Sequence, residues 1–201
     1  VFTLNRLGKF EYNDGSVLSA QNYYQQAISE YENSLDLLGQ GPDYGVLYED
    51  LGDIYYYSAG KFSEAYREYR KAESTGYRND NLSYKIGFIH YWNKNYRDSA
   101  EKFYEISVRE RDNESVLFAF ANSSFHNGVF SPARAYYEQV VDKLEYWRDH
   151  QGLLELDRRR DQRLVLEKLM QVYNNLGVAL YKLSERDRNT SYYSNALVYF
   201  T

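Results

Sequence analysis

Residues 51–69 read LGDIYYYSAGKFSEAYREY, and residues 86–103 read IGFIHYWNKNYRDSAEKF. Each stretch starts with a large aliphatic residue and a glycine. Each then brings an aromatic residue, a small residue three positions later, and a second aromatic residue four positions after that. These residues are Phe62, Ala65 and Tyr69 in the first stretch and Tyr96, Ser99 and Phe103 in the second. Because Gly52 and Gly87 lie about 35 residues apart, the two stretches predict a structural repeat of that length.

A third copy of the pattern follows the second. Ala121 follows Gly87 at nearly the interval that separates Gly87 from Gly52, and Phe130, Ala133 and Tyr137 then supply the aromatic, small and aromatic positions. Small residues let two helices approach closely, and large residues beside them fill the space between neighbours. The spacing therefore predicts three consecutive pairs of packed helices.

Two less regular copies lie near the ends of the sequence. Leu7-Gly8 is followed by Ala27, and Leu176-Gly177 is followed by Ala196, and the interval from glycine to alanine is the same in both. We interpret both as repeats with a lengthened loop between their two helices, near residues 13–19 and 184–190.

The rest of the sequence also favours helices. Only two prolines, Pro42 and Pro132, occur among the 201 residues. Apolar residues from Leu166 to Leu183 recur at steps of three and four, as one face of a helix requires. No stretch shows the strict alternation of a half-buried strand. The sequence therefore predicts an all-α fold.

These residues together give the chain its resemblance to the tetratricopeptide repeat (TPR) family. The resemblance implies about five antiparallel helix pairs stacked into a right-handed superhelical solenoid. The approximate repeats are residues 1–40, 44–78, 79–112, 113–142 and 166–201, in a single array that extends over residues 1–201. Residues 143–165 form an insertion, which we expect to prolong the flanking helices into a protruding helical hairpin. Because the sequence begins and stops inside expected repeats, we interpret it as a piece of a longer protein.

In this family the first helices of successive repeats line a concave groove that holds a partner. Aligning the repeats places one set of first-helix side chains on that groove. The set comprises Glu49, Asp53, Tyr56, Tyr57, Tyr84, Phe88, Tyr91, Trp92, Phe118, Asn122, Phe125, His126, Asn174, Val178, Tyr181 and Lys182. Most of its members are aromatic, and contiguous exposed aromatic residues are typical of binding surfaces. Three occupants stay open: a partner protein or peptide, a helix of the same protein, and a small apolar ligand.

The charges and the composition argue against several other functions. The formal net charge is −5, whereas binding to phosphate backbones requires clustered Lys and Arg, so we expect no nucleic-acid partner. Some TPR domains hold acidic chaperone tails with inward-facing cations, but Glu49 and Asp53 stand on the corresponding face, so we do not expect that ligand here. No apolar run is long enough to cross a bilayer, so we expect no direct membrane insertion.

Nothing in the sequence forms a catalytic or cofactor motif. The chain has no cysteine, and none of His90, His126 and His150 has a second ligand at a strong metal-binding spacing. We therefore expect no catalytic residues, no metal site, no cofactor and no enzymatic activity in this segment.

The sequence thus predicts a protein–protein interaction scaffold or adaptor that binds a partner through an aromatic groove. An alternative is a structural subunit that self-associates through its ends, its loops or residues 143–165. The stretch from Asn174 to Leu183 resembles large spirochaetal TPR proteins, some of which belong to the collar of the periplasmic flagellar motor. That resemblance favours the alternative, and it implies flagellar motility and a periplasmic location; without it we expect a cytoplasmic one.

Overall fold

The structure of the protein is a computed structural model that describes residues 17–37, 41–150 and 161–200. Every regular element among these residues is a helix, which confirms the all-α fold class. The chain divides into two compact units. Unit 1 ends at Ile89 and unit 2 begins at His90, so the division falls inside one helix.

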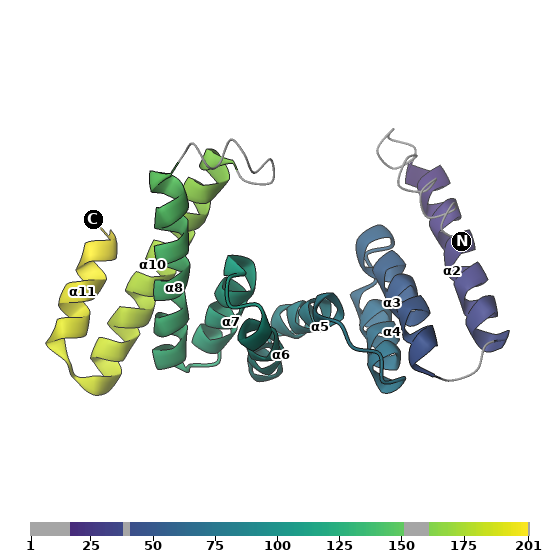
Figure 1. The fold of residues 1–201 in the computed structure, drawn as a ribbon, viewed down its shortest axis with the longest axis horizontal. Coiled ribbons are helices and arrows are strands. Elements are labelled where there is room, and N and C mark those ends of the chain that lie inside the picture. The colour runs from purple at the N-terminus through teal and green to yellow at the C-terminus, as the bar shows by residue number, and fades with distance from the viewer. Residues whose placement is uncertain (1–16, 38–40, 151–160, 201) are drawn as a thin grey trace. The chain divides into compact units, whose positions relative to one another are not determined.

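The helices follow one another with short connections (Figure 1). Unit 1 contains α2 (Val17–Leu37), the 3-10 turn η1 (Pro42–Tyr44), α3 (Gly45–Asp53), the π-helix η2 (Ile54–Ser58), α4 (Phe62–Ser74) and most of α5 (Asp80–Trp92). Unit 2 contains the end of α5, α6 (Tyr96–Arg109), α7 (Glu114–His126), α8 (Phe130–Asp149), α10 (Gln162–Asp187) and α11 (Thr190–Phe200).

The core of unit 1 is organised around Tyr69 of α4, whose side chain is fully buried. Gly52 of α3 makes room for this ring, because a Cβ added at position 52 would lie 2.4 Å from Cε1 of Tyr69. Leu82 and Ile86 of α5 and Ala65 of α4 belong to the same buried cluster. A small residue on the first helix and a large aromatic residue on the second thus give the close helix contact that the sequence predicted.

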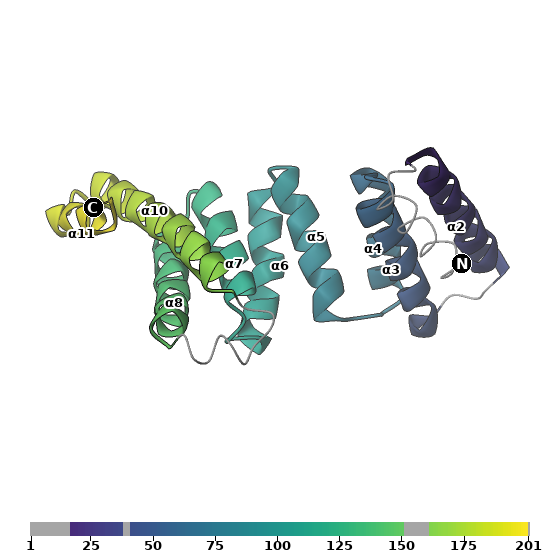
Figure 2. The same ribbon diagram turned by 90° about the horizontal axis from the view of Figure 1, so that it is seen from above.

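The core of unit 2 repeats this arrangement around Tyr137 of α8. Its ring is fully buried in one cluster with Leu117 and Ala121 of α7 and with Leu169 and Leu176 of α10. Figures 1 and 2 show α8 side by side with α10, and α10 turning back into α11 as a hairpin. Most of the core residues are aliphatic, so apolar burial is the main stabilising contribution.

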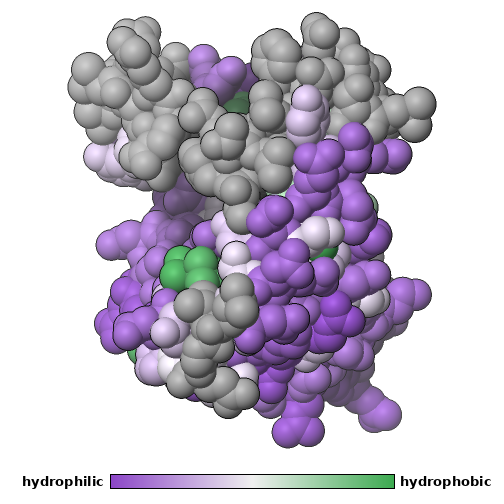
Figure 3. All heavy atoms as spheres, turned by 90° about the vertical axis from the view of Figure 1, so that its right-hand side faces the viewer, coloured by the Kyte–Doolittle hydropathy of each residue, from purple (hydrophilic) through white to green (hydrophobic). Residues whose placement is uncertain are grey.

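Helix α2 presents a polar outer surface to solvent. Ala20, Tyr24 and Ala27 are buried, whereas the residues between them include the exposed Gln21 and Gln25. This alternation at helical spacing is the amphipathic pattern of a helix packed on one side only. The side of the molecule shown in Figure 3 is mostly hydrophilic where it is coloured.

Four turns between paired helices contain a residue with a positive φ angle. Gly60, Lys94 and Gly128 have φ angles of 64°, 61° and 77° at matching positions of consecutive repeats, and Arg188, between α10 and α11, has a φ angle of 50°. A left-handed residue of this kind closes a helix C-terminus and reverses the chain. Lys94 and Arg188 adopt this conformation although it favours glycine.

The π-helix η2 explains the one irregular spacing among the central repeats. Gly52 is eight residues before Gly60, whereas Ala121 is seven residues before Gly128. The extra residue is absorbed by the wider winding over Ile54–Ser58, so the turn at Gly60 keeps its position relative to the core. A one-residue insertion in the first helix is thereby accommodated without a change in the turn.

One expectation about the loops was wrong. Helix α10 continues to Asp187 and α11 begins at Thr190, so only Arg188 and Asn189 connect them instead of a lengthened loop near residues 184–190. The interval from Gly177 to Ala196 is seven residues longer than the interval from Ala121 to Ala133 in the third repeat. Longer helices contain these residues, because seven residues make about two helical turns. In the first repeat, α2 already begins at Val17 within the expected loop, and residues 1–16 lie outside the described residues.

Around the predicted insertion, α8 extends to Asp149 and α10 starts at Gln162. Both helices therefore run into the range 143–165 from either side. The expected tip of the hairpin, residues 151–160, lies outside the described residues.

Candidate interaction surfaces

A buried ionic cluster joins α3, α4 and α5 in unit 1. The ammonium of Lys85 lies 2.8 Å from Oε1 of Glu49 and 2.7 Å from Oδ1 of Asp53. The hydroxyl of Tyr69 donates a hydrogen bond of 2.8 Å to the same carboxylate of Asp53. Tyr77 and Asn79 each donate to Oε2 of Glu49. We call Glu49, Asp53, Tyr69 and Lys85 the ionic cluster.

The ionic cluster corrects the prediction that Glu49 and Asp53 line an open groove. Glu49 is buried and Asp53 is half-buried, and the carboxylates of both are engaged by Lys85. Burial by itself lowers the pKa of Lys85, but the hydrogen bonds and negative charges of Asp53 and Glu49 outweigh it and raise that pKa above its ordinary value. Burial, followed by the charge of Asp53, raises the pKa of Tyr69 strongly, so its phenol stays protonated.

Unit 2 contains a neutral counterpart at the equivalent positions. The hydroxyl of Tyr137 donates a hydrogen bond of 2.6 Å to Oδ1 of Asn122, and Nδ2 of Asn175 donates one of 3.1 Å to the same oxygen. Burial also raises the pKa of Tyr137. We call Asn122, Tyr137 and Asn175 the amide cluster. It places Asn122 between α8 and α10 and thereby makes it part of the helix packing.

In unit 1 the structure brings the predicted aromatic residues of α5 and η2 together. Tyr56 of η2 packs edge-on against Tyr57 and against Phe62 of α4, with ring centroids 4.7 Å and 5.1 Å apart. Tyr84 and Phe88 stack one helical turn apart on α5 at 6.2 Å. Tyr56 is half-buried, whereas the side chain of Tyr57 is 62% exposed. Tyr57 is therefore an exposed ring that rests on the half-buried ring of Tyr56.

In unit 2 a second aromatic group forms where α5 ends and α7 ends. Tyr91 lies edge-on to Tyr96 at 5.5 Å and to His126 at 5.6 Å, and His126 stacks on Tyr96 at 4.9 Å. Phe125 packs edge-on against both His126 and Phe130, at 5.5 Å in each case. Tyr91 and Phe125 are half-buried, so they support this surface, while His126 is exposed.

The remaining predicted residues are distributed differently. Trp92, the residue after Tyr91, is 67% exposed. Phe118 packs on the unit 2 core, with its ring centroid 6.0 Å from that of Tyr137. Tyr181 of α10 is exposed and contacts Tyr193 of α11 at 6.4 Å. The set of residues predicted from the sequence thus contains exposed rings, half-buried rings that support them, and residues of the core.

Sequence reasoning missed the first aromatic residue of each second helix as part of these surfaces. Phe62, Tyr96 and Phe130 were recognised as repeat markers, yet they pack against Tyr56, Tyr91 and Phe125 at the ends of the first helices. The signal was available, because each pair flanks one helix–helix turn. Lys85 was missed entirely, since a lone lysine in a helix carries no sign of burial.

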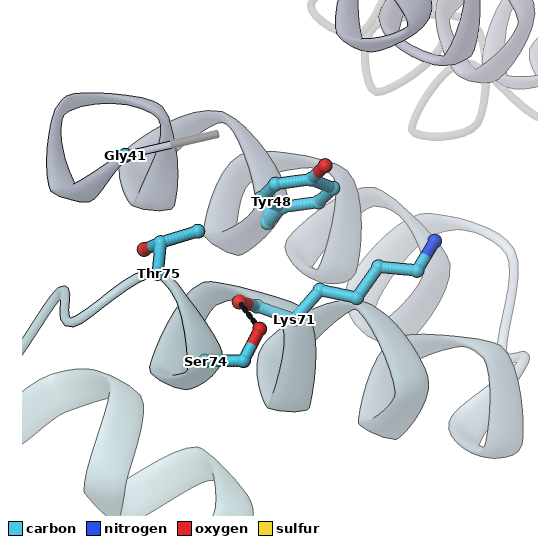
Figure 4. Close-up of a pocket in the computed structure, with 5 residues that line it drawn as sticks. All are labelled: Gly41, Tyr48, Lys71, Ser74 and Thr75. Atoms are coloured by element: carbon cyan, nitrogen blue, oxygen red, sulfur yellow. Dashed lines mark hydrogen bonds between the residues drawn. The ribbon is translucent and has the colours of Figure 1, made fainter. Parts of the chain in front are cut away.

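Each unit also has a hollow at the other end of its helix pair, away from the turns. The unit 1 hollow has a volume of about 400 Å³ and is lined by Gly41, Tyr48, Lys71, Ser74 and Thr75 (Figure 4). The ammonium of Lys71 lies 5.7 Å from the centroid of the Tyr48 ring, a cation–π distance. The unit 2 hollow has a volume of about 460 Å³ and is lined by Asp112, Glu114, Asp142, Lys143, Tyr146 and Trp147.

Among the described residues, no group of three or more His, Asp or Glu side chains is placed to hold a metal ion. None of the helices described is both long and apolar enough to cross a membrane.

Comparison with known proteins places the fold. No protein-family model and no curated protein matches the chain. The crystal structure of the MamA protein is similar over 98% of this chain and 90% of that one, at 13% identity and a TM-score of 0.61. A Podosopora anserina protein of nearly identical TPR-like repeats covers 98% and 93%, at 13% identity and a TM-score of 0.59.

A tetratricopeptide repeat protein from Parabacteroides merdae is also similar. It covers 98% of this chain and 71% of its own, at 15% identity and a TM-score of 0.51. At identities this low the likeness concerns the fold, and it establishes that the chain has the helical-repeat fold of TPR proteins.

Proposed function

We propose that this TPR-fold chain is a non-enzymatic scaffold that binds a partner protein or peptide through exposed aromatic residues of its first helices. The surface in unit 1 comprises Tyr56, Tyr57, Tyr84 and Phe88, and the one in unit 2 comprises Tyr91, Trp92, Phe125 and His126. In this proposal Phe118 and Asn122 support the second surface through the packing of unit 2. Tyr181 contacts the partner outside both surfaces.

The observation that carries the proposal is the exposure of Trp92 and Tyr57. These rings are 67% and 62% exposed, although most large apolar side chains of the neighbouring helices are buried. Leaving aromatic rings in water forgoes the stabilisation that burial provides. Tryptophan and tyrosine are also the residue types that most often dominate the binding energy of protein interfaces.

The supporting rings make these residues suitable anchors. Tyr57 rests on Tyr56, which in turn packs on Phe62, so the phenol ring loses little freedom when a partner covers it. An interface anchor that is already ordered loses less entropy on binding than a flexible one. Ordered and exposed rings suit a macromolecular partner that covers them, whereas a small ligand would need an enclosed cavity.

Affinity capture from extract of the source cells tests the proposal. The bait is the chain itself, and the test bait carries Tyr57→Ala with Trp92→Ala. Both residues are exposed, so we expect their removal to leave the fold intact, unlike removal of the half-buried Tyr91 or Phe125. Captured proteins are identified by mass spectrometry, and far-ultraviolet circular dichroism verifies that the test bait is helical.

A matched control bait carries Tyr104→Ala with Tyr146→Ala, two tyrosines that are about half exposed and lie on second helices. The proposal expects a partner on the chain and on the control bait, and its loss from the test bait. Equal capture by the test bait would refute the role of these rings.

The alternative, a subunit that self-associates, is favoured by one observation at α11. Phe200 occupies the position of Tyr69, Phe103 and Tyr137, which are all buried, yet it is 50% exposed. Tyr193 and Leu197 are exposed on the same stripe, seven and three residues earlier. Sedimentation of the chain and of a Leu197→Glu variant distinguishes the cases, because only self-association through this face gives a concentration-dependent mass that the variant abolishes. The resemblance to spirochaetal collar proteins stays a prediction that none of the comparisons tests.

A further inference from the structure

Lys94 and Arg188 are the two residues other than glycine that have a positive φ angle in the part of the chain that the structure describes. Both belong to unit 2, and each stands in the turn that follows a first helix, α5 for Lys94 and α10 for Arg188. A left-handed backbone favours glycine and, among the other residues, asparagine and aspartate. The backbone of these turns therefore gives no reason for a long cationic side chain at either position.

The helix dipole does not supply that reason either. The C-terminus of a helix favours a nearby positive charge, but α5 already has the basic residue His90 in its last turn, and α10 already has Arg186 there. Gly60 and Gly128 close the matching turns of their repeats without a cation at that position. A cation in the turn is thus not needed to end these helices.

The positive charges of the two turns are not neutralised within the protein. Both cationic side chains are exposed, and neither forms an ion pair or a hydrogen bond with the residues that the structure describes. The nearest carboxylates along the chain have other basic neighbours, because Oδ2 of Asp98 lies 3.9 Å from Nδ1 of His90, and Oδ1 of Asp187 lies 2.6 Å from Nε of Arg186. The two cations therefore remain available to a group from another molecule.

The turns after α5, α7 and α10 form one continuous edge of unit 2. Tyr96, the first residue of α6, stacks on His126, the last residue of α7, with ring centroids 4.9 Å apart. Nη2 of Arg186 donates a hydrogen bond of 3.2 Å to Oγ of Ser131 at the start of α8, and Figure 1 shows the turns after α7 and α10 at the same, lower end of these helices. We call residues 93–95, 127–129 and 188–189 the turn edge.

Trp92 stands beside the turn edge, two residues before Lys94, and its ring is 67% exposed. An apolar side chain that covers this ring brings the neighbouring residues of the same partner segment close to the ammonium of Lys94. An exposed ion pair adds little affinity, but it steers the encounter and discriminates between partners. The cations of the turn edge thus suit a role in the choice of partner.

We propose that the turn edge binds an acidic segment of the partner protein, with carboxylates at Lys94 and Arg188 and an apolar side chain on Trp92. The inference rests on the proposed function, because Trp92 is one of its two main anchors, and it adds the chemical class of the partner. A segment without carboxylates keeps only the apolar contact, and a basic segment is repelled.

Selection of random peptides displayed on phage tests this inference. Fusion to the coat protein leaves the peptides without a free C-terminal carboxylate, so every acidic group that is selected is a side chain. The peptides of interest bind the chain and fail to bind its Trp92→Ala variant. We expect them to carry Asp or Glu near an aromatic or aliphatic residue. The chain with Lys94→Glu and Arg188→Glu should select Lys or Arg instead, a gain that misfolding cannot produce.

A synthetic peptide of the selected sequence measures the contribution of each cation through fluorescence anisotropy. Lys94→Gly and Arg188→Gly should each weaken binding about two- to fivefold, as the loss of one exposed ion pair does. Glycine suits the left-handed backbone of both turns, so these variants should keep the fold. Lys168→Gln removes an exposed cation of α10 outside the turn edge and should leave the affinity unchanged.

The outcomes separate this inference from the proposed function. Selected peptides that depend on Trp92 but carry no excess of acidic residues would overturn the inference and leave the proposed function in place. Unchanged selection by the charge-reversed chain would overturn it in the same way. Failure to select any peptide that depends on Trp92 would count against both.

Discussion

The ionic cluster of unit 1 and the amide cluster of unit 2 hold equivalent residues of the repeat together, with charged groups in unit 1 and neutral groups in unit 2. Asp53 and Asn122 each follow the small residue of a first helix, and Tyr69 and Tyr137 occupy the same position of their second helices. In both units a buried tyrosine hydroxyl donates to the side-chain oxygen of this residue. The second donor to that side chain is the ammonium of Lys85 in unit 1 and the amide of Asn175 in unit 2.

The geometry of the repeat is therefore more general than the charge of its parts. The first helices of both units hold a polar residue against a buried tyrosine, but only unit 1 does so with a buried ion pair among the described residues. Buried ions are costly to remove from water, and their attraction offsets this cost only while every partner is present. Unit 1 should therefore depend on single side chains far more than unit 2 does.

The largest difference is expected when the cation is removed. Lys85→Met keeps an unbranched side chain but leaves Glu49 and Asp53 without their ammonium, and breaking a buried ion pair in this way costs about 3–5 kcal/mol of unfolding free energy. Hydrogen exchange should accelerate in α3 and α4, while α8 and α10 keep their protection. Lys61→Met, which removes the side chain of an exposed lysine of the same unit, is the control.

A triple variant tests whether unit 1 requires the charges or only the geometry of the ionic cluster. Glu49→Gln, Asp53→Asn and Lys85→Gln together replace the ions of unit 1 by amides and should recover most of the stability lost in Lys85→Met. A triple variant as unstable as the single one would show that unit 1 requires the charges themselves.

The next effect concerns the close contact between first and second helices. A Cβ at Gly52 would lie 2.4 Å from the ring of Tyr69, which cannot move because it is buried and bonded to Asp53. Gly52→Ala should therefore lower the free energy of unfolding by about 1–3 kcal/mol. Gly177→Ala meets Phe200, which is half exposed and can give way, so the higher helix propensity of alanine, up to about 1 kcal/mol, should compensate. Thermal denaturation of both variants measures the difference, and equal destabilisation would contradict it.

A smaller effect is expected in the amide cluster. Asn175→Ala removes one neutral hydrogen bond to Asn122 and leaves the bond from Tyr137, so we expect a loss of about 0.5–1.5 kcal/mol in urea denaturation. A loss as large as that of Lys85→Met would show that the neutral cluster is no more tolerant than the charged one.

The smallest effect is expected from strongly alkaline titration. The pKa of Lys85 and that of Tyr69 are raised in the folded state, and burial with Asp50 raises the pKa of Tyr31 to about 12. The folded state thus holds these protons more tightly than the unfolded chain, so their stabilisation is complete below the ordinary values near 10 and is lost as the pH rises through the raised ones. The absorbance of phenolate, followed with hydrogen exchange, should show unit 1 opening before unit 2. Simultaneous opening would count against the ionic cluster.

The sequence predicted the repeat and its helices correctly, because close packing requires small and aromatic residues at fixed positions such as Gly52 and Tyr69. It misplaced Glu49 and Asp53, since their burial depends on Lys85, which reaches them from another helix. It also assigned residues 184–190 to a loop, because the charged stretch there resembles one, yet polar residues are equally stable at the exposed end of a long helix. The sequence placed Tyr57 and Trp92 on the groove together with Tyr56 and Tyr91, but it could not distinguish the exposed rings from the half-buried rings that support them.

The most direct test of the scaffold function is site-specific photo-crosslinking with benzoyl-phenylalanine placed at position 92, at position 57 or, as a control, at position 104. We expect covalent capture of the same partner protein from positions 92 and 57 and little or none from position 104. Crosslinks that join only parts of the chain itself, or a partner captured equally from all three positions, would contradict it.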